Sequence, residues 1–227
     1  MNSNQSNDNK ENGNKKENGN LDKRKLTKAE LKRKADFDLM CENLKNEGYE
    51  QHNLTMSALF GNIIAFVIAI PIIFIMAAGY MAVNGDLEIN LESTNCFILC
   101  IGIILFTVVH ELIHGVTWAA FAKNHWKAIS FGFIVQYLTP YCSCNAPMKK
   151  YQIIMGALMP TIVLGVIPGI VTIFTGNSII WLLAMIMVLG GGGDMACVIK
   201  VMSYRGKKKD KLYIDHPYEL GIVVFDR

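Results

Sequence analysis

The sequence predicts an α-helical polytopic membrane protein of four transmembrane helices, with a short cytoplasmic-side β-hairpin between the second and third. Three observations support this fold class. Apolar residues make up 52% of the 227 residues and charged residues 18%, whereas a soluble domain carries about 25% charged residues. Four apolar runs are each long enough to cross a membrane. No Lys or Arg occurs between Asn46 and Ala122.

The N-terminal region precedes the first apolar run. Residues 1–26 contain almost no apolar residues, so they cannot bury enough surface to offset their ordering entropy and are predicted to be a disordered tail. Residues 27–50 are predicted to form a cytoplasmic juxtamembrane helix, because Thr27 and Glu30 have the spacing of a capping box. This helix is expected to lie near the lipid headgroups, and its few apolar contacts are Leu31, Phe37, Leu39 and Leu44.

The four runs define a membrane domain over residues 57–203, followed by a cytoplasmic C-terminal segment, 204–227. Each run has the roughly 20 residues that a helix needs to cross a hydrocarbon core of about 30 Å. Prolines inside such spans are tolerated where neighbouring groups satisfy the freed carbonyls. The predicted spans are about 57–80, 96–122, 153–175 and 178–203.

The positive charges fix the predicted orientation. Of the 22 Lys and Arg residues, eleven precede residue 50, four lie in the connection 123–152, and seven lie from Lys200 onward. The connection 81–95 has none and carries three carboxylates. By the positive-inside rule, the protein is a multi-pass protein of the cell membrane with both termini cytoplasmic. Membrane lipid, and no nucleic acid, is the expected partner of these charges, because they flank apolar runs.

The connection between the second and third spans has a strand pattern. Large apolar residues alternate with mostly smaller or polar ones, and Thr139-Pro140 is expected to end the run. This alternation predicts one arm of a β-hairpin lying against the membrane face of the bundle. The alternating residues are Ile129, Phe131, Phe133, Val135 and Tyr137.

The six cysteines do not predict a disulfide framework. Three of them fall on the predicted cytoplasmic side, where thiols stay reduced, and Cys142-Ser143-Cys144 lacks further metal ligands at usable spacing. The other three lie in apolar runs, where we interpret them as small buried residues. These are Cys96, Cys100 and Cys197.

The run His110-Glu111-Leu112-Ile113-His114 in the second span predicts a metal site. Two histidines four residues apart point the same way on a helix, so both imidazoles can reach one tetrahedral zinc ion. Glu111 lies about 100° around the helix, where it can contact water in the open position of such a site and act as a general base. Inserting an ionisable side chain deep into a membrane costs roughly 2.5–3.5 kcal/mol on insertion scales. The presence of His110, Glu111 and His114 in one span therefore favours a functional role for them.

Asp194 is the predicted third protein ligand. It is the only carboxylate of the fourth span. Both spans run from outside to inside, and residue counting places Asp194 at the depth of His110 and His114. The four glycines that precede it cost a helix roughly 1 kcal/mol each, which makes sense where backbones pack closely or a helix opens.

Other residues compete for roles in this site. His216 and Glu219 are rival third ligands, but they lie beyond the last span and would have to fold back into the bundle. His125 is expected at the interface and His52 in solvent. Thr107 and Trp118 lie one turn on either side of the histidine pair; a Trp at that depth often anchors packing, and we assign neither a catalytic role.

These residues resemble those of a bacterial family of zincin membrane peptidases. The resemblance covers roughly residues 96–225 and rests on the run from His110 to Gly115, the Tyr141-Cys142 region, Pro160 and Gly193-Asp194. The chain is also more distantly similar to site-2 proteases, which cleave peptide bonds within the bilayer. That resemblance implies a zinc centre of His110, His114 and Asp194, with Glu111 activating water.

The sequence departs from the site-2 pattern around the aspartate. Those proteases usually place Asn and Pro before it and Gly after it, whereas here Gly190–Gly193 precede Asp194 and Met195 follows. The leading hypothesis is therefore a metallopeptidase with one zinc ion per chain, acting on peptide or membrane-protein substrates. The alternatives are a zinc-binding membrane protein without proteolytic activity, such as a sensor or assembly factor, and a small transporter. The absence of a visible inverted repeat argues against a transporter.

Overall fold

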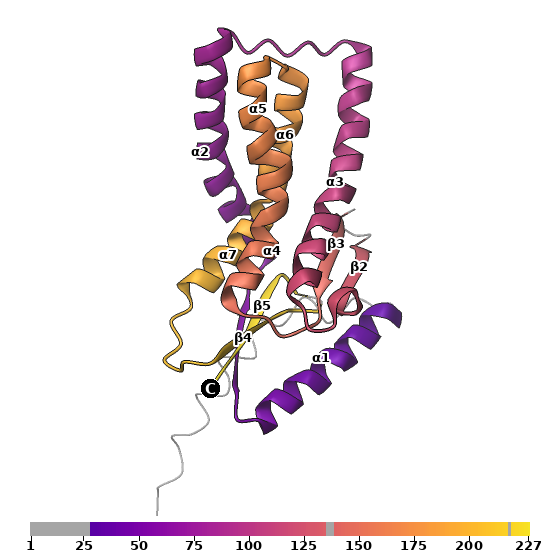
Figure 1. The fold of residues 1–227 in the computed structure, drawn as a ribbon, viewed down its shortest axis with the longest axis vertical. Coiled ribbons are helices and arrows are strands. Elements are labelled where there is room, and N and C mark those ends of the chain that lie inside the picture. Colours follow the sequence, from indigo (N-terminus) through magenta and orange to yellow (C-terminus); the bar gives the residue numbers. More distant parts are fainter. Residues whose placement is uncertain (1–27, 135–138, 218) are drawn as a thin grey trace, which may run out of the picture.

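A bundle of apolar helices stands on a smaller region made of one helix and two small β-sheets (Figure 1). The computed structural model describes residues 28–134, 139–217 and 219–227. Within those residues, three helices are long and apolar enough to cross a membrane, or four if one bent pair counts as a single span. The predicted tail, residues 1–26, lies outside the described residues.

The first two predicted spans are single long helices. Helix α2 covers Ala58–Asn84 and begins at Ser57, whose side chain accepts a hydrogen bond from the backbone N–H of Phe60. Helix α3 covers Ser93–Phe121. The two helices stand on opposite sides of α5 (Ile167–Thr175) and α6 (Ser178–Gly190), and are joined to each other at the far end of the bundle (Figure 1).

The third predicted span consists of three consecutive segments. Helix α4 covers Lys150–Pro160, a π-helical segment, η3, covers Thr161–Val166, and α5 completes the span. The irregularity follows Pro160, which has no N–H to donate and whose ring disfavours regular helical hydrogen bonding. Gly176, in the left-handed conformation with φ of 70°, ends α5 and turns the chain into α6.

The fourth predicted span is broken. Helix α6 ends at Gly190, and α7, Gly192–Ser203, continues at an angle of 41° to it. Two of the four glycines are required by packing. A Cβ at Gly191 would meet the hydroxyl of Thr161, and a Cβ at Gly192 would meet the backbone of Ala65 in α2. The glycine run therefore serves both purposes that the sequence indicated, close packing and an interruption of the helix.

The hairpin forms as predicted, with one difference. Strand β2, Ile129–Ile134, pairs antiparallel with β3, Thr139–Cys144. Thr139-Pro140 thus begins the second arm rather than ending the run, and Val135 and Tyr137 lie outside the described residues. A short 3₁₀ segment, η1, His125–Ala128, connects α3 to β2.

The second sheet was not predicted. Strands β1 (Glu50–Thr55), β5 (Gly221–Asp226) and β4 (Lys211–Asp215) form an antiparallel sheet in the order β1-β5-β4. The C-terminal segment therefore folds back to pair with the strand that precedes α2. A single bridge between Met148 and Tyr213 joins this sheet to the chain that leaves the hairpin.

The N-terminal helix α1, Lys28–Asn46, contacts this sheet. Leu44 and Cys41 are buried in a cluster with residues of β4 and β5, and Phe37 packs against the same cluster. Leu31 and Leu39 are exposed, so they stay outside this cluster, and the position of the helix near lipid headgroups stays a prediction. The sheet, which was missing from the prediction, supplies the apolar partner of this helix.

All six cysteines are free, as the sequence indicated. The interpretation of the span cysteines as buried was wrong for Cys100, which is exposed on α3, and only partly right for Cys96 and Cys197, which are half-buried. In a span, an exposed side chain faces the apolar surroundings of the bundle. A small apolar thiol is suited to that position as well as to a core.

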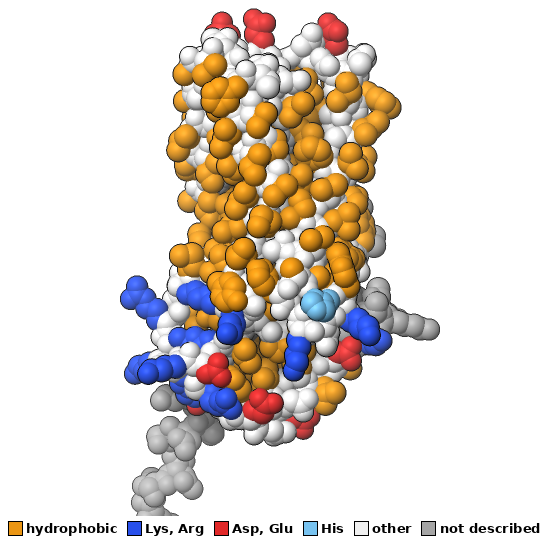
Figure 2. Space-filling view, viewed as in Figure 1, with side chains coloured by type: hydrophobic (Ala, Val, Ile, Leu, Met, Phe, Trp, Pro, Cys, Tyr) orange, Lys and Arg blue, Asp and Glu red, His pale blue; other side chains and the backbone are white. Residues whose placement is uncertain are grey.

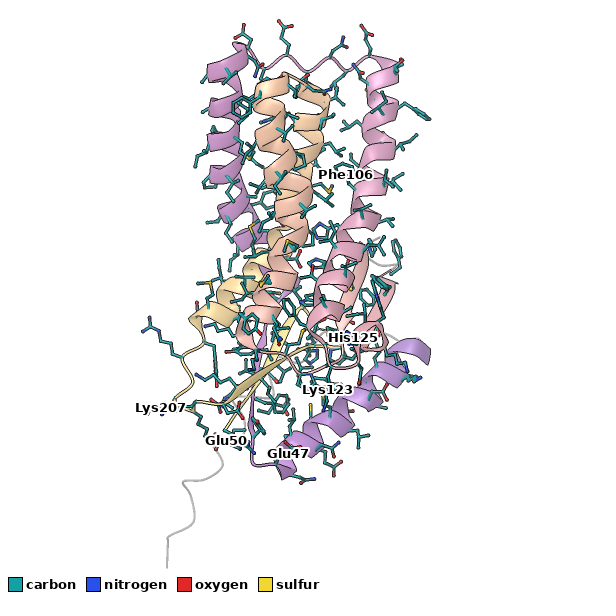
Figure 3. All side chains as sticks on the ribbon, viewed as in Figure 1. Glu47, Glu50, Phe106, Lys123, His125 and Lys207 are labelled. Carbon is teal, nitrogen blue, oxygen red and sulfur yellow. The ribbon has the colours of Figure 1, made fainter. Side chains whose placement is uncertain are left out.

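The basic side chains are confined to one end of the molecule. Figure 2 shows a broad belt of apolar side chains, with acidic side chains alone at the end where α2 joins α3, and basic side chains together with acidic ones at the opposite end. Lys123, His125 and Lys207 lie at this second end, beside the sheets, whereas Phe106 lies well inside the belt (Figure 3).

We predict that two neighbouring glycines of α7 respond oppositely to the same substitution. Gly192→Ala places a methyl group against the backbone of Ala65, so it is expected to lower the free energy of unfolding by about 1–3 kcal/mol. In Gly193→Ala, the new Cβ would have nothing within 4 Å. The higher helix propensity of alanine is therefore expected to raise the free energy of unfolding by up to about 1 kcal/mol. Apparent unfolding temperatures in detergent measure both. Equal effects of the two substitutions would contradict the packing described for α2 and α7.

Candidate metal centre

Helix α3 places two imidazoles on one face of the bundle interior. His110 and His114 lie one turn apart, and their ring centroids are 4.9 Å apart in an edge-on arrangement. Their side chains are 10% and 4% exposed. The i, i+4 spacing thus brings two nitrogen donors together, as the sequence predicted.

Asp194 approaches the same point from α7. Its Oδ2 atom lies 3.2 Å from Nε2 of His110 and 3.3 Å from Nε2 of His114. Asp194 lies in the first turn of α7, where the positive end of the helix dipole favours a negative charge. The equal depth inferred by counting residues along the two spans therefore corresponds to direct proximity in the structure.

The hydrogen bond on the far side of His114 tests whether these residues fit a metal ion. Nδ1 of His114 lies 2.8 Å from the carbonyl oxygen of Gly156. A carbonyl only accepts hydrogen bonds, so Nδ1 carries the proton. In the neutral imidazole, Nε2 then presents a lone pair to the carboxylate of Asp194. This contact is favourable when a metal ion lies between the two groups, or when Nε2 carries a proton and the two form an ion pair. A histidine ligand of a metal typically donates its other N–H to a carbonyl in this way.

The spacing of the donors also fits zinc. Zn–N and Zn–O bonds of about 2.0–2.2 Å place neighbouring ligands of a tetrahedral site about 3.3–3.5 Å apart. The two His–Asp distances of 3.2 and 3.3 Å are close to that value, and all three donor atoms lie within 4.8 Å of one another. Two imidazole nitrogens and one carboxylate oxygen leave a fourth position open, which is the arrangement of catalytic rather than structural zinc sites.

Glu111 lies beside this group without belonging to it. Its half-buried carboxylate interacts electrostatically with His110, His114 and Asp194, and the backbone N–H of Cys142 in β3 is a hydrogen-bond donor to it. Among the described residues, the set of three donors does not include Glu111. The hairpin therefore orients the carboxylate next to the predicted metal position, as a general base requires and a ligand does not.

The rival ligands lie elsewhere. Nδ1 of His216 accepts a hydrogen bond from the backbone N–H of Glu219, and its ring contacts Phe37 of α1. His125 is exposed, and its Nδ1 lies 3.1 Å from the carbonyl of Ala119. None of these three polar residues belongs to a group of potential ligands in the described part of the chain.

A second group of donors lies on the three-stranded sheet, where Glu50, His52 and Asp226 come within 4.8 Å of one another. Its carboxylates already have partners. Lys208 forms an ion pair of 2.7 Å with Glu50, and the hydroxyl of Tyr204 donates to Asp226 over 2.9 Å. Nε2 of His52 lies 3.3 Å from Asp226, and the His52 side chain is 41% exposed, so the predicted contact with solvent is confirmed and an acidic neighbour is added. These contacts account for the group without a metal.

Sequence reasoning missed two residues beneath the centre. Asp215 ends strand β4 and interacts electrostatically with His114, Asp194 and Arg33. Arg33 of α1 is buried, donates to the hydroxyl of Ser143 over 3.2 Å, and lies 4.7 Å from the ring centroid of Tyr141. The alternation Leu212, Ile214 could have indicated a strand ending at Asp215, but no local signal indicates that α1 reaches the hairpin.

A comparison with protein families identifies the segment that carries this centre. Residues 103–208 match the model of a family described as "putative zincin peptidase". The match contains His110, Glu111, His114 and Asp194, and leaves α1, α2 and β4 outside. No curated protein and no solved structure matches the chain.

The carboxyl group of Asp215 predicts a pH dependence of stability in the metal-free protein. Burial raises its pKa to about 7, although His114 and Arg33 favour the charged form. In the unfolded chain the group ionises near pH 4. The folded state thus binds this proton more tightly, and the resulting stabilisation is present below about pH 4 and is lost as the pH rises to about 7.

Asp215→Asn removes this dependence while keeping an acceptor oxygen. We expect the unfolding temperature of the variant to rise relative to the unsubstituted protein between pH 4.5 and 7.5, measured in detergent with a chelator present. Asp86→Asn, at an exposed position, is the matched control and should show no such trend. A constant difference between Asp215→Asn and the unsubstituted protein would contradict the prediction.

Proposed function

We propose that the protein is a zinc-dependent, membrane-embedded endopeptidase, and the match of residues 103–208 to the family described as "putative zincin peptidase" supports this proposal. Its proposed reaction is the hydrolysis of peptide bonds in membrane-associated substrates. One observation carries this proposal: three donors suited to zinc converge within 4.8 Å, with the carboxylate of Glu111 beside them and outside the donor set.

His110, His114 and Asp194 would hold one zinc ion per chain. The tautomer of His114 and the distances between donors support this assignment. Zinc, when bound in such a site, polarises the scissile carbonyl and lowers the pKa of water in the open position. The proposed ligand side chains differ in exposure, 28% for Asp194 and 10% or less for the histidines.

Glu111 is the proposed general base. Its carboxylate would take a proton from the attacking water and return it to the leaving amine, so the residue acts in both halves of the reaction. The backbone N–H of Cys142 occupies part of its hydrogen-bonding capacity and fixes its orientation. A carboxylate held next to the ligands has a role in hydrolysis, whereas a zinc sensor or assembly factor has no need of it.

Strand β2 is the proposed substrate-docking edge. It pairs only with β3 among the described strands, and its Phe131 lies against Gly115, the residue after His114, where a Cβ would meet the phenyl ring. An extended peptide added to the outer edge of β2 would therefore run close to the metal-binding turn of α3. Main-chain hydrogen bonds would supply affinity in this mode of binding, with limited dependence on the sequence of the substrate.

The apolar helices support a position in the cell membrane, with both termini cytoplasmic. Basic side chains gather only at the end of the bundle that bears the sheets, whereas acidic ones lie at both ends (Figure 2), and this placement of Lys and Arg is the asymmetry of the positive-inside rule. Membrane lipid is then the partner of the apolar belt. The proposed centre would lie in the half of the molecule toward the cytoplasm.

We expect the site residues to separate metal binding from hydrolysis. Glu111→Gln should retain one zinc per chain and lower peptide cleavage by roughly 10²–10⁴-fold, the usual contribution of a general base. His110→Ala and Asp194→Ala should lose zinc as well as activity. Zinc is measured by elemental analysis of purified protein, and cleavage with an unfolded peptide and with a single-span membrane protein in liposomes.

Glu88→Gln, an exposed carboxylate at the opposite end of the bundle, is the control for both measurements. Undiminished cleavage by Glu111→Gln would refute its role as base. Full zinc occupancy in Asp194→Ala would remove Asp194 from the ligand set. Stoichiometric zinc with no cleavage of either substrate by the unsubstituted protein would favour the alternative, a zinc-binding membrane protein without proteolytic activity.

Fusion reporters test the proposed orientation. Green fluorescent protein fused after Arg227 should fluoresce in intact cells, because that end is proposed to be cytoplasmic. Alkaline phosphatase inserted after Glu88 should be active, because that enzyme folds only outside the cytoplasm. The opposite pattern at either site would refute the orientation without bearing on the metal centre.

A further inference from the structure

An aromatic side chain lies directly against the metal-facing imidazole of His114. Trp118 follows one turn later on α3, its ring is tilted by only 14° from that of His114, and the two ring centroids are 4.9 Å apart. The indole is buried. A stacked indole at this distance limits large rotations of the imidazole about its side-chain bonds, because a ring turned far out of the stacked orientation would collide with the indole.

Gly156 of α4 is the residue that allows this arrangement. A Cβ at Gly156 would overlap the indole ring of Trp118 at Nε1, Cδ1 and Cε2. The absence of a side chain lets α4 come close enough for the carbonyl of Gly156 to accept the hydrogen bond from Nδ1 of His114, over 2.8 Å. One glycine therefore accommodates the indole and supplies the acceptor.

The indole N–H shows which property of Trp118 matters. It has no hydrogen-bond partner among the described residues, although buried indole N–H groups usually have one. Hydrogen bonding by Trp118 therefore does not explain its position. What the side chain provides is a flat surface beside His114 and volume between α3 and α4.

We infer that Trp118 and Gly156 are positioning residues that hold His114 with Nδ1 bonded to α4 and Nε2 directed at Asp194. This inference rests on the proposed metal centre and extends it to residues that touch no metal. Removing a group that orients a ligand typically lowers metal affinity 10–100-fold. The stacking of Trp118 and the hydrogen bond to the carbonyl of Gly156 both act on the imidazole of His114. Loss of either contact is therefore expected to lower zinc affinity to a similar extent.

The test compares zinc affinity in full-length variants purified in detergent and freed of metal. Gly156→Ala and Trp118→Leu should each weaken zinc binding by 10–100-fold, measured by competition with a chromophoric chelator. Trp118→Phe keeps a flat ring and dispenses with the unpartnered N–H, so its affinity should stay within about threefold of the unsubstituted protein. Gly102→Ala is the control, because its Cβ meets only the flexible side chain of Leu183.

Bound Co²⁺ provides a second measurement, because its absorption responds to the geometry of the ligands and not to a general loss of stability. The visible absorption of bound Co²⁺ reports ligand geometry, and it should shift in Gly156→Ala and Trp118→Leu but not in Trp118→Phe or Gly102→Ala. Trp118→Leu introduces no overlap, so it keeps the test decisive if Gly156→Ala does not fold.

Two failures are distinguishable. Unchanged zinc affinity and unchanged cobalt absorption in folded Trp118→Leu would overturn the positioning role while leaving the metal centre intact. Absence of zinc binding by the unsubstituted protein, or unchanged affinity in His114→Ala, would instead refute the proposed centre itself.

Discussion

The approach of one carboxylate to two imidazoles inside an apolar bundle is the constraint on which the remaining structure depends. Asp194 brings an oxygen within 3.3 Å of both ring nitrogens, and the bond from His114 to Gly156 directs Nε2 of His114 at that oxygen. Without a cation, such a group is costly to bury, because charges and lone pairs removed from water need a partner. The proposed zinc ion would balance this charge, and the helices are arranged so that three potential donors meet at one point.

Glycines allow the helices to pack closely enough for the carboxylate and the two imidazoles to meet. Gly156 lets α4 approach α3, and Gly192 lets α7 approach α2. Gly191 makes room for Thr161, at the point where α6 gives way to α7. A straight helix through this point would continue along α6, whereas the 41° bend starts a new helix whose first turn carries Asp194. The electrostatic benefit of a carboxylate at a helix N-terminus thus depends on the same break that gives α7 its direction.

Features with a local signal were predictable from the sequence, and features that join distant segments were not. Hydropathy predicts the four spans, the i, i+4 spacing predicts the histidine pair, and residue counting predicts the common depth of Asp194. The sheet β1-β5-β4 pairs Glu50 with Asp226. These residues are far apart in the sequence, and the residue types in two short strands do not indicate that the strands pair with each other. The contacts of Arg33 with the hairpin, the electrostatic position of Asp215 and the carbonyl of Gly156 likewise arise only after packing, since a backbone acceptor carries no signal in the residue type.

The position of the centre along α3 places it deeper than the middle of a membrane. His110 is seventeen residues from Ser93, the first residue of α3 and its outer end in the proposed orientation, which is about 26 Å at 1.5 Å per residue. With Ser93 at the outer boundary of a core of about 30 Å, the centre lies near the inner boundary rather than at mid-membrane. The burial cost assigned to the histidines is accordingly smaller than the mid-membrane value. In the proposed orientation, water for the proposed hydrolysis would reach the centre from the cytoplasmic side, and β2 would lie near the boundary of the membrane on that side. A peptide bond at that level would be the preferred one under the proposed function, because an extended segment there could pair with β2 without exposing unpaired backbone groups to lipid.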